Sequence, residues 1–217
     1  MNTEKARFNM VEQQIRPWNV LDPEVLDLLF EVRREEFVPQ NYRSLAFADV
    51  EIPLSTSAVM MAPRMEARLL QELELASDAR ILEVGTGSGY MTALLASQGA
   101  HVTSLEIDPV LQAQAQANLD EAGIENVTLV LGDGLKGYEA GEPYDAIILT
   151  GSVPSVPGVL VHQLALGGRL MAVVGSGPVM EVVRIHCTSP GAYSQETLFE
   201  TYVPPLENAP RAATFAL

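Results

Sequence analysis

The chain has 217 residues, of which 47% are hydrophobic and 19% charged. These values are typical of a globular domain and exclude a largely disordered chain. The formal net charge is −15, and so acidic a surface repels phosphate backbones unless a local basic patch exists. The densest basic pair, Arg33-Arg34, is followed at once by Glu35-Glu36. We therefore expect no nucleic acid partner.

Cysteine content and hydropathy indicate the cellular compartment in which the protein is expected. The single cysteine, Cys187, excludes an internal disulfide and fits a reducing environment. No apolar run approaches the ~18 residues of a membrane span. The stretch from Met1 to Arg16 is polar and carries no signal-peptide core. We expect a cytoplasmic protein without membrane association.

The first 75 residues predict helices separated by proline-containing segments. In residues 3–16 the apolar positions Phe8, Val11 and Ile15 recur at helical spacing, and Pro17 ends the pattern. A second helix is expected over 22–35 and a third after Pro63, with an irregular stretch at about 37–60 between them. We expect residues 1–75 to form a helical cap packed on the rest of the chain.

From Asp78 onward the pattern alternates between strand and helix. Strands are expected over 80–84, 101–106, 126–131, 145–150 and 168–174, and helices over 90–97, 109–122 and 156–165. Such alternation indicates a mostly parallel, doubly wound α/β sheet. Two further strands within 179–203 are expected to close the sheet as an antiparallel pair. The prediction is a single domain, 1–217, whose α/β core is 76–217.

A glycine-rich segment joins the first expected strand of this core to its helix. It reads Glu83-Val84-Gly85-Thr86-Gly87-Ser88-Gly89-Tyr90. In that context backbone amides and the helix N-terminus approach a bound ligand closely. A dinucleotide fingerprint needs its third glycine one place later, where Tyr90 stands, so nicotinamide or flavin binding is disfavoured. A glycine turn that binds nothing remains an alternative.

Acidic residues follow the next two strands. Glu106 ends the second strand, and Gly132-Asp133-Gly134 follows the third. Ligands of doubly wound sheets bind at the carboxyl ends of strands, near the point where strand order reverses. There Glu106 can accept both ribose hydroxyls, and Asp133 can accept from an adenine amino group. The plain alternatives are a solvated strand end for Glu106 and a turn for Asp-Gly.

The glycine loop with these two acids resembles the cofactor site of S-adenosylmethionine-dependent methyltransferases. The resemblance implies a Rossmann-like fold with S-adenosyl-L-methionine as cofactor. It assigns Glu83 and the glycine loop to the methionine end and Glu106 to the ribose. It assigns Asp133 with Leu135 to the adenine region, and it adds Ile107 and Gly134 to the same site.

Further motifs resemble one family more closely, protein-L-isoaspartate (D-aspartate) O-methyltransferase. They run in that family's order over most of the chain: Met-Val-Glu-Gln-Gln-Ile at 10–15, Phe-Val-Pro at 37–39, Ala-Asp at 48–49, Leu-Glu-Val-Gly-Thr-Gly-Ser-Gly-Tyr at 82–90, Gly-Asp-Gly at 132–134 and Gln-Leu-x-Leu-Gly-Gly at 163–168. The resemblance implies methylation of a carboxylate of damaged aspartyl residues, with isoaspartyl proteins or peptides as substrate and protein repair as the role.

The chain departs from this family in the substrate loop. The family reads Gly-x-x-Gln-Thr-Ile-Ser, then one residue, then Pro. Aligned on Pro63 without a gap, this chain has Val59 in place of the threonine and Met61 in place of the serine. The upstream hydroxyls of Ser55, Thr56 and Ser57 substitute only if the loop shifts by several residues.

Methyl transfer to a carboxylate needs no general base, because an Asp-like carboxyl with a pKa of about 3.9 is already ionised near pH 7. The enzyme aligns the oxygen with the methyl group and excludes water. Loss of one hydrogen bond to a charged group costs roughly 10–150-fold in binding. Arg64 can reach a carboxylate in a bidentate way or lie on the surface. Met60 and Met61 can line an apolar wall or simply fill the core.

The remaining chemically active side chains show no functional spacing. No metal-ligand pattern links the three histidines, so no metal site is predicted; they are His101, His162 and His186. Cys187 is expected to be a buried structural thiol, and Trp18 and Tyr42 are expected to pack the cap.

Three hypotheses follow for function. The first is a protein-carboxyl methyltransferase of the isoaspartyl-repair type, or a divergent relative that keeps the cofactor site. The second is a methyltransferase for another acceptor, marked by a closed apolar pocket behind Met60 and Met61. The third is a cofactor-binding protein without catalysis, since one fold hosts many activities. Methyl acceptor and oligomeric state are left open.

Overall fold

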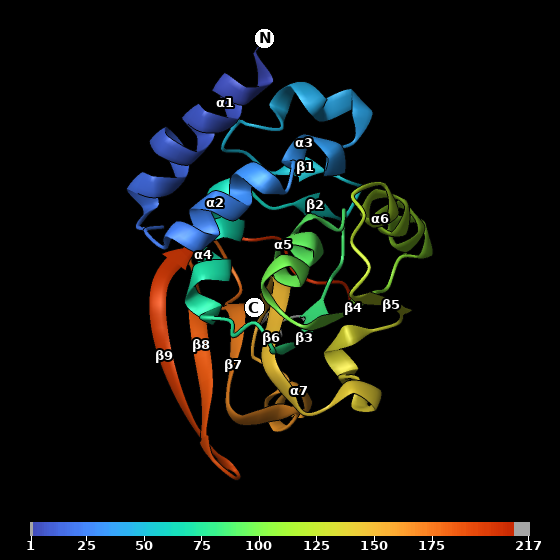
Figure 1. Cartoon of the computed structure of the whole chain (residues 1–217). Coiled ribbons are helices and arrows are strands. Elements are labelled where there is room, and N and C mark those ends of the chain that lie inside the picture. Colours follow the sequence, from blue (N-terminus) through green and yellow to red (C-terminus); the bar gives the residue numbers. More distant parts are fainter. Residues whose placement is uncertain (1, 211–217) are drawn as a thin grey trace, which may run out of the picture.

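The structure, a computed structural model, describes residues 2–210 and is built around a seven-stranded sheet. The strand order is β5-β4-β3-β6-β7-β8-β9 (Figure 1). The strands are β3 (Arg80–Val84), β4 (His101–Glu106), β5 (Val127–Leu131), β6 (Tyr144–Val153), β7 (Leu164–Val174), β8 (Met180–Ser189) and β9 (Ala192–Thr201). The first five in the spatial order pair in parallel, and β8 and β9 add an antiparallel hairpin. The predicted doubly wound α/β fold is confirmed.

The central strand β3 marks the point where the winding reverses. It pairs with β4 on one side and β6 on the other, both in parallel. Its residues from Ile81 to Val84 are all buried, as expected for a strand covered on both faces. The loops that follow β3 and β6 therefore leave the sheet in opposite directions, which opens a crevice at the carboxyl ends of the strands.

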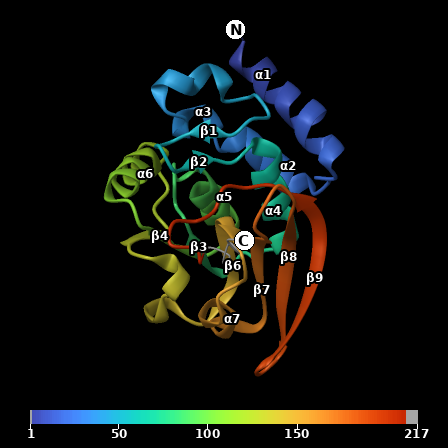
Figure 2. The ribbon, with the colours of Figure 1, turned by 180° about the vertical axis from the view of Figure 1, so that it is seen from behind.

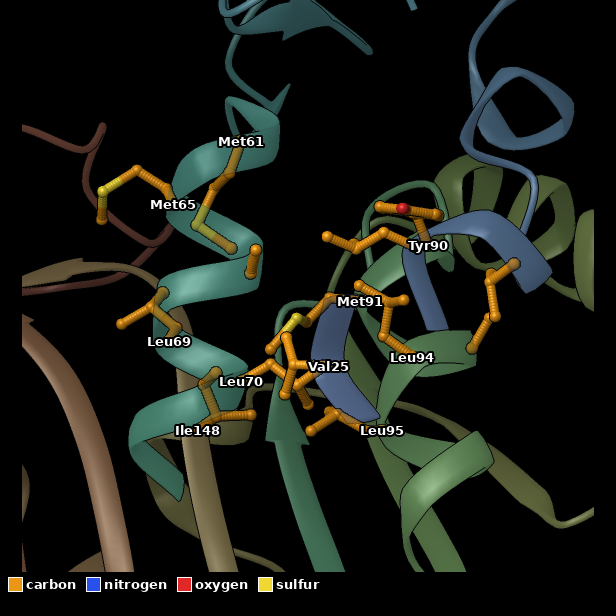
Figure 3. Close-up of a cluster of buried hydrophobic side chains, with 14 of the residues drawn as sticks. Val25, Met61, Met65, Leu69, Leu70, Tyr90, Met91, Leu94, Leu95 and Ile148 are labelled. Carbon is orange, nitrogen blue, oxygen red and sulfur yellow. The ribbon is translucent and has the colours of Figure 1, made fainter. Parts of the chain in front are cut away.

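Helices cover both faces of the sheet. They are α4 (Pro63–Leu73), α5 (Tyr90–Gln98), α6 (Pro109–Glu121) and α7 (Gly158–His162). Consecutive strand residues point to opposite faces, so Ile81 joins the apolar cluster that contains α4 and α5, and Leu82 joins the cluster that contains α7. Figure 3 shows side chains of α4 and α5 facing one another, with Ile148 of β6 among them.

The N-terminal segment forms the cap. It contains α1 (Thr3–Met10), a π-helical turn (Val11–Ile15), a 3-10 turn (Arg16–Trp18), α2 (Pro23–Glu31), α3 (Arg34–Phe37), a second 3-10 turn (Gln40–Leu45) and the paired strands β1 (Ile52–Pro53) and β2 (Val59–Met60). The parallel strands and β9 end at the same edge of the sheet. Figures 1 and 2 show the cap beyond this edge, at the top of both views. Its buried residues share one apolar cluster with α4, α5 and the sheet.

The cap differs from its prediction in three places. The helix expected over 22–35 is broken, because Val32 and Arg33 are extended between α2 and α3. Pro17 lies inside the 3-10 turn that continues the first helix, so it does not end the helical stretch. The irregular stretch 37–60 contains a two-stranded hairpin, so the cap is not wholly helical.

The expected helix over 156–165 is wrong in its second half. The helix α7 ends at His162, and Leu164 already pairs with Tyr144 of β6. The register of β7 then shifts before Arg169 pairs with Ala146, and Gly167 has a φ of +81° at this irregularity. The apolar residues that suggested a helix therefore begin a bulged strand.

The chain after β9 returns across the carboxyl edge of the sheet (Figure 2). Residues 202–210 run beside the end of β6, where Pro205 forms a parallel bridge with Ser152. The Ser152 N–H donates to the Pro204 carbonyl at 3.0 Å, and the Leu206 N–H donates to the Ser152 carbonyl at 3.0 Å. This segment, called here the C-terminal strap, is thereby fixed over the crevice.

Candidate active site

A cavity of about 920 Å³ occupies the crevice. One side is the strand-end wall, which we define as residues 84–88, 105–108 and 132–135 after β3, β4 and β5. Another side is the hairpin wall, residues 54, 55 and 57–61 around β2. Residues 150–154 at the end of β6, residues 175–177 between β7 and β8, Met180 of β8 and the C-terminal strap also line the cavity. Three successive strand ends thus meet at one cavity, as the sequence predicts.

The glycine loop of the strand-end wall depends on backbone conformations that favour glycine. Gly85, Gly87 and Gly89 all have positive φ, at +98°, +55° and +84°. A Cβ atom on Gly85 would lie 2.4 Å from the Thr150 Oγ1. The loop can therefore pass close to the end of β6 only because this residue has no side chain. Gly85, Thr86, Gly87 and Ser88 reach the cavity.

Glu106 is fixed by three backbone donors. Its Oε2 accepts from the Gly87 N–H at 2.8 Å, and its Oε1 accepts from the Ile107 and Asp108 N–H groups at 2.9 and 3.1 Å. The residue is only 6% exposed and lines the cavity. Of the about four lone-pair sites of a carboxylate, these N–H groups occupy both on Oε1 and one on Oε2, so Oε2 keeps a site for one further donor. A ligand hydroxyl is the natural partner for this remaining site.

Asp133 stands at the end of β5. Its Oδ1 accepts from the Leu135 N–H at 3.2 Å, which begins the 3-10 turn Gly134–Lys136. Its Oδ2 lies 3.5 Å from the Lys136 Nζ. Asp133, Gly134, Leu135 and Ile107 all line the cavity, so the structure brings these predicted residues together with Glu106.

Four other predicted residues do not reach the cavity wall. They are Glu83, Gly89, Tyr90 and Arg64. The fully buried Tyr90 packs on Phe37 with ring centroids 5.5 Å apart, so it belongs to the cap–core interface. Arg64 pairs with Asp49 and lies 4.2 Å above the Trp18 ring, which leaves it engaged outside the cavity.

Glu83 lies buried beneath the glycine loop. Its Oε2 accepts from the hydroxyls of Thr92 and Ser104, the latter at 2.6 Å, and Ser104 in turn contacts the Thr86 hydroxyl at 2.6 Å. Burial raises the pKa of Glu83 to about 8, although these two hydrogen bonds act in the opposite direction. Glu83 thus supports Thr86, a residue of the strand-end wall, from below.

The structure adds a buried ion pair that the sequence does not reveal. Arg34 is fully buried and pairs with Glu66 of α4, a cavity-lining residue. Its guanidinium also donates to the carbonyls of Ala46 and Met61, at 3.1 and 2.7 Å, and lies 5.0 Å above the Tyr90 ring. Arg34 therefore holds the end of the hairpin wall. Within the run Arg33 to Glu36, only tertiary packing distinguishes it from a solvated charge.

The hairpin wall is mostly apolar. Val59, Met60 and Met61 line the cavity, and Met61 also belongs to the core cluster of Figure 3. Ser55 and Ser57 line the cavity as well, so two upstream hydroxyls reach it, whereas Thr56 is not on the wall. The Ser55 Oγ already accepts from the Ser57 and Ala58 N–H groups at 3.2 and 3.1 Å.

The charged residues of the wall are of one sign. Five acidic residues line the cavity, and within residues 2–210 no lysine, arginine or histidine does; the five are Glu66, Glu106, Asp108, Asp133 and Glu207. Glu66 is compensated by Arg34. The lining therefore favours a ligand with a positive charge and hydrogen-bond donors.

Between residues 2 and 210 no group of three or more His, Cys, Asp or Glu side chains is arranged to hold a metal ion. Over the same residues, no helix combines the length and the apolar character required to cross a bilayer. Cys187 is buried, as expected.

Comparison with known proteins gives a consistent result. The family model "Protein-L-isoaspartate(D-aspartate) O-methyltransferase (PCMT)" matches residues 5–209. A protein-L-isoaspartate O-methyltransferase from Methanoculleus marisnigri is 39% identical over 181 residues, covering 83% of this chain and 82% of the relative. Its counterpart from Gloeobacter violaceus is 35% identical over 197 residues, covering 91% and 96%.

Among solved structures, the fold matches that of a beta-aspartate methyltransferase (PCMT) from Plasmodium falciparum in complex with S-adenosyl-L-homocysteine. The TM-score is 0.82 over 95% of this chain and 99% of the other, at 21% identity. At that identity the match concerns the fold. The sequence relatives carry the family relationship, and they span nearly the whole chain.

Proposed function

Because this chain belongs to the protein-L-isoaspartate(D-aspartate) O-methyltransferase family, we propose that it methylates the free carboxylate of isoaspartyl residues in proteins or peptides, with S-adenosyl-L-methionine as methyl donor. Protein repair is the corresponding role, and a cytoplasmic location belongs to the same proposal.

The wall of the cavity fits this cofactor. Glu106 is the observation that carries the proposal, because three backbone N–H groups fix this buried carboxylate in the cavity wall and leave its Oε2 able to accept from a ribose hydroxyl. The acidic lining suits a positively charged sulfonium. Gly85 to Ser88 would hold the methionine portion, and Asp133 to Leu135 the adenine. When bound, the cofactor supplies an electrophilic methyl group on a sulfur that departs as a neutral thioether.

The chain's own task is alignment. The acceptor carboxylate is already ionised near pH 7, so no side chain has to remove a proton. The hairpin wall and the C-terminal strap both line the cavity and limit the access of water, which would otherwise solvate the attacking oxygen. Holding the two reactants in one geometry can lower the barrier of such a reaction by about 7–11 kcal/mol.

The test is a labelled-methyl assay on two peptides of one sequence, one with isoaspartate and one with ordinary aspartate. The proposal expects base-labile methyl ester on the isoaspartyl peptide alone. Calorimetry with S-adenosyl-L-homocysteine provides the control for a correctly folded site. Cofactor-product binding without label on either peptide would contradict the proposed acceptor.

One observation favours a second candidate, a methyltransferase for a different acceptor. Val59 and Met61 place a methyl-bearing and a thioether side chain on the hairpin wall, where the family pattern has hydroxyls. A more apolar carboxylate acceptor would fit these side chains. A screen of small carboxylic acids under the same assay distinguishes the two, since preferential labelling of an apolar acid supports the second candidate.

A further inference from the structure

Ser152 occupies a special place among the hydroxyl groups of the cavity. It lies at the end of β6, its residue is 1% exposed, and it contributes to the cavity wall. Its Oγ has no hydrogen-bond partner among the described residues. A buried polar atom without a partner costs free energy of folding, so such an atom at a cavity points to a ligand group that completes it.

The other buried or half-buried hydroxyls on the wall are already engaged. Thr86 contacts Ser104, and the Ser88 Oγ, in the glycine loop that the proposed function assigns to the cofactor, accepts from the Tyr90 N–H at 3.4 Å, which leaves the Ser88 proton without an acceptor among the described residues. The Thr150 hydroxyl faces the carbonyls of Val84 and Gly85, at 3.0 and 2.6 Å, which use its single proton. Ser152 is thus the buried cavity hydroxyl whose proton and lone pairs are both unassigned.

The position of Ser152 is fixed by its main chain. Its N–H and carbonyl are both bonded to the C-terminal strap, to Pro204 and Leu206 at 3.0 Å each. A side chain on so constrained a backbone has only its χ1 rotation left. It can turn its hydroxyl toward a ligand without any rearrangement of the loop, which keeps the loss of conformational entropy small.

The cavity offers no cationic side chain to the carboxylate that would accept the methyl group. Within residues 2–210 no Lys, Arg or His lines the wall, and Arg64 is held by Asp49 outside it. Val59 and Met61 offer no donor either. An acceptor carboxylate must therefore be bound by neutral donors, of which buried ones are the most effective because water does not compete for them.

We propose that the Ser152 hydroxyl binds the methyl acceptor, by donating a hydrogen bond to the carboxylate oxygen that does not attack. The assignment rests on the proposed function and deepens it. Ser152 transfers no proton, since the carboxylate is ionised before reaction and the ester forms without one. It orients the acceptor while the other oxygen remains free.

The experiment compares S152A with S155A, the same change at an exposed serine three residues later that does not line the cavity. For S152A we expect the KM of the isoaspartyl peptide to rise about 10- to 100-fold. We expect its affinity for S-adenosyl-L-homocysteine to stay within about twofold of wild type. The melting temperature of the free protein should be equal or higher, because the change removes an unsatisfied buried hydroxyl. S155A should match wild type throughout.

Each alternative outcome overturns a defined statement. An unchanged peptide KM in S152A, with wild type active, overturns the role of Ser152 and leaves the proposed function standing. A loss of S-adenosyl-L-homocysteine affinity in S152A also overturns it, because the hydroxyl would then serve the cofactor. A wild-type protein that binds S-adenosyl-L-homocysteine but methylates no isoaspartyl peptide overturns the proposed function and the acceptor role together.

Discussion

The two walls of the cavity are built on different principles. The strand-end wall uses backbone conformation, glycines with positive φ and a carboxylate held by three N–H groups. The hairpin wall uses side-chain volume, with Val59, Met60 and Met61 supported from behind by Arg34. The backbone features of the strand-end wall are tied to the fold. The side chains of the hairpin wall change with a few substitutions, so under the proposed function the choice of methyl acceptor can vary while the cofactor site is kept.

The largest effect is expected from breaking the support of the hairpin wall. R34M leaves the Glu66 carboxylate buried without its partner and should lower the free energy of unfolding by about 3–5 kcal/mol. Chemical denaturation measures this loss. The double variant R34M/E66L removes both charges and should recover most of it. A double variant no more stable than the single one would show that the guanidinium acts mainly through the Ala46 and Met61 carbonyls.

The next effect concerns the strand-end wall. E106A removes the carboxylate proposed to accept a hydrogen bond from the ribose, and it should weaken S-adenosyl-L-homocysteine binding about 10- to 150-fold. Calorimetry is the measurement, with E121A on the exposed end of α6 as the matched control. Unchanged affinity in E106A would place the ribose elsewhere.

A third prediction uses pH to examine the layer beneath that wall. The pKa of Glu83 is raised to about 8 in the folded protein, from the ordinary carboxyl value of 4.5. The folded state therefore keeps a proton that the unfolded state releases, and the stabilisation present below about pH 4.5 is lost as the pH rises through about 8. E83Q removes this titration. Between pH 5 and 6 wild type should lose on the order of 1 kcal/mol more stability than E83Q does. Parallel pH profiles in thermal unfolding would contradict the assignment.

The smallest effect tests the departure in the hairpin wall. V59T restores one hydroxyl on a half-buried, cavity-lining position. If the wall faces the acceptor, the KM for an isoaspartyl peptide should fall by about three- to tenfold, the value of one added neutral hydrogen bond. Steady-state kinetics measure it, and V110T on the exposed face of α6 serves as control. A change confined to S-adenosyl-L-homocysteine affinity would mean that Val59 faces the cofactor.

Much of the strand-end wall could be predicted from the sequence, for a physical reason. The strands 80–84 and 101–106 are found at the predicted residues, because an apolar run that stops at a glycine turn or an acidic residue has few alternative boundaries. The acids Glu106 and Asp133 follow from the rule that ligands gather at the carboxyl ends of parallel strands.

The rest depended on contacts that local patterns do not encode. The pattern at 156–165 predicts a helix where β7 begins, because its apolar residues fit either structure until strand pairing decides. Arg34 sits in a run of charges that looks solvated, and only the packing of α3 on α4 and α5 buries it. Ser152 is a single serine beyond the strand predicted at 145–150. Its burial without a hydrogen-bond partner depends on the tertiary structure, in which the C-terminal strap pairs with it, and no local pattern indicates this.

A crystal soaked with S-adenosyl-L-homocysteine tests the central claim most directly, namely that the strand-end wall binds the cofactor and the hairpin wall faces the acceptor. We predict density along the glycine loop, with the ribose hydroxyls on Glu106, the adenine beside Asp133 and the sulfur toward Val59 and Ser152. Density absent from this cavity, or a ribose turned away from Glu106, would contradict the account.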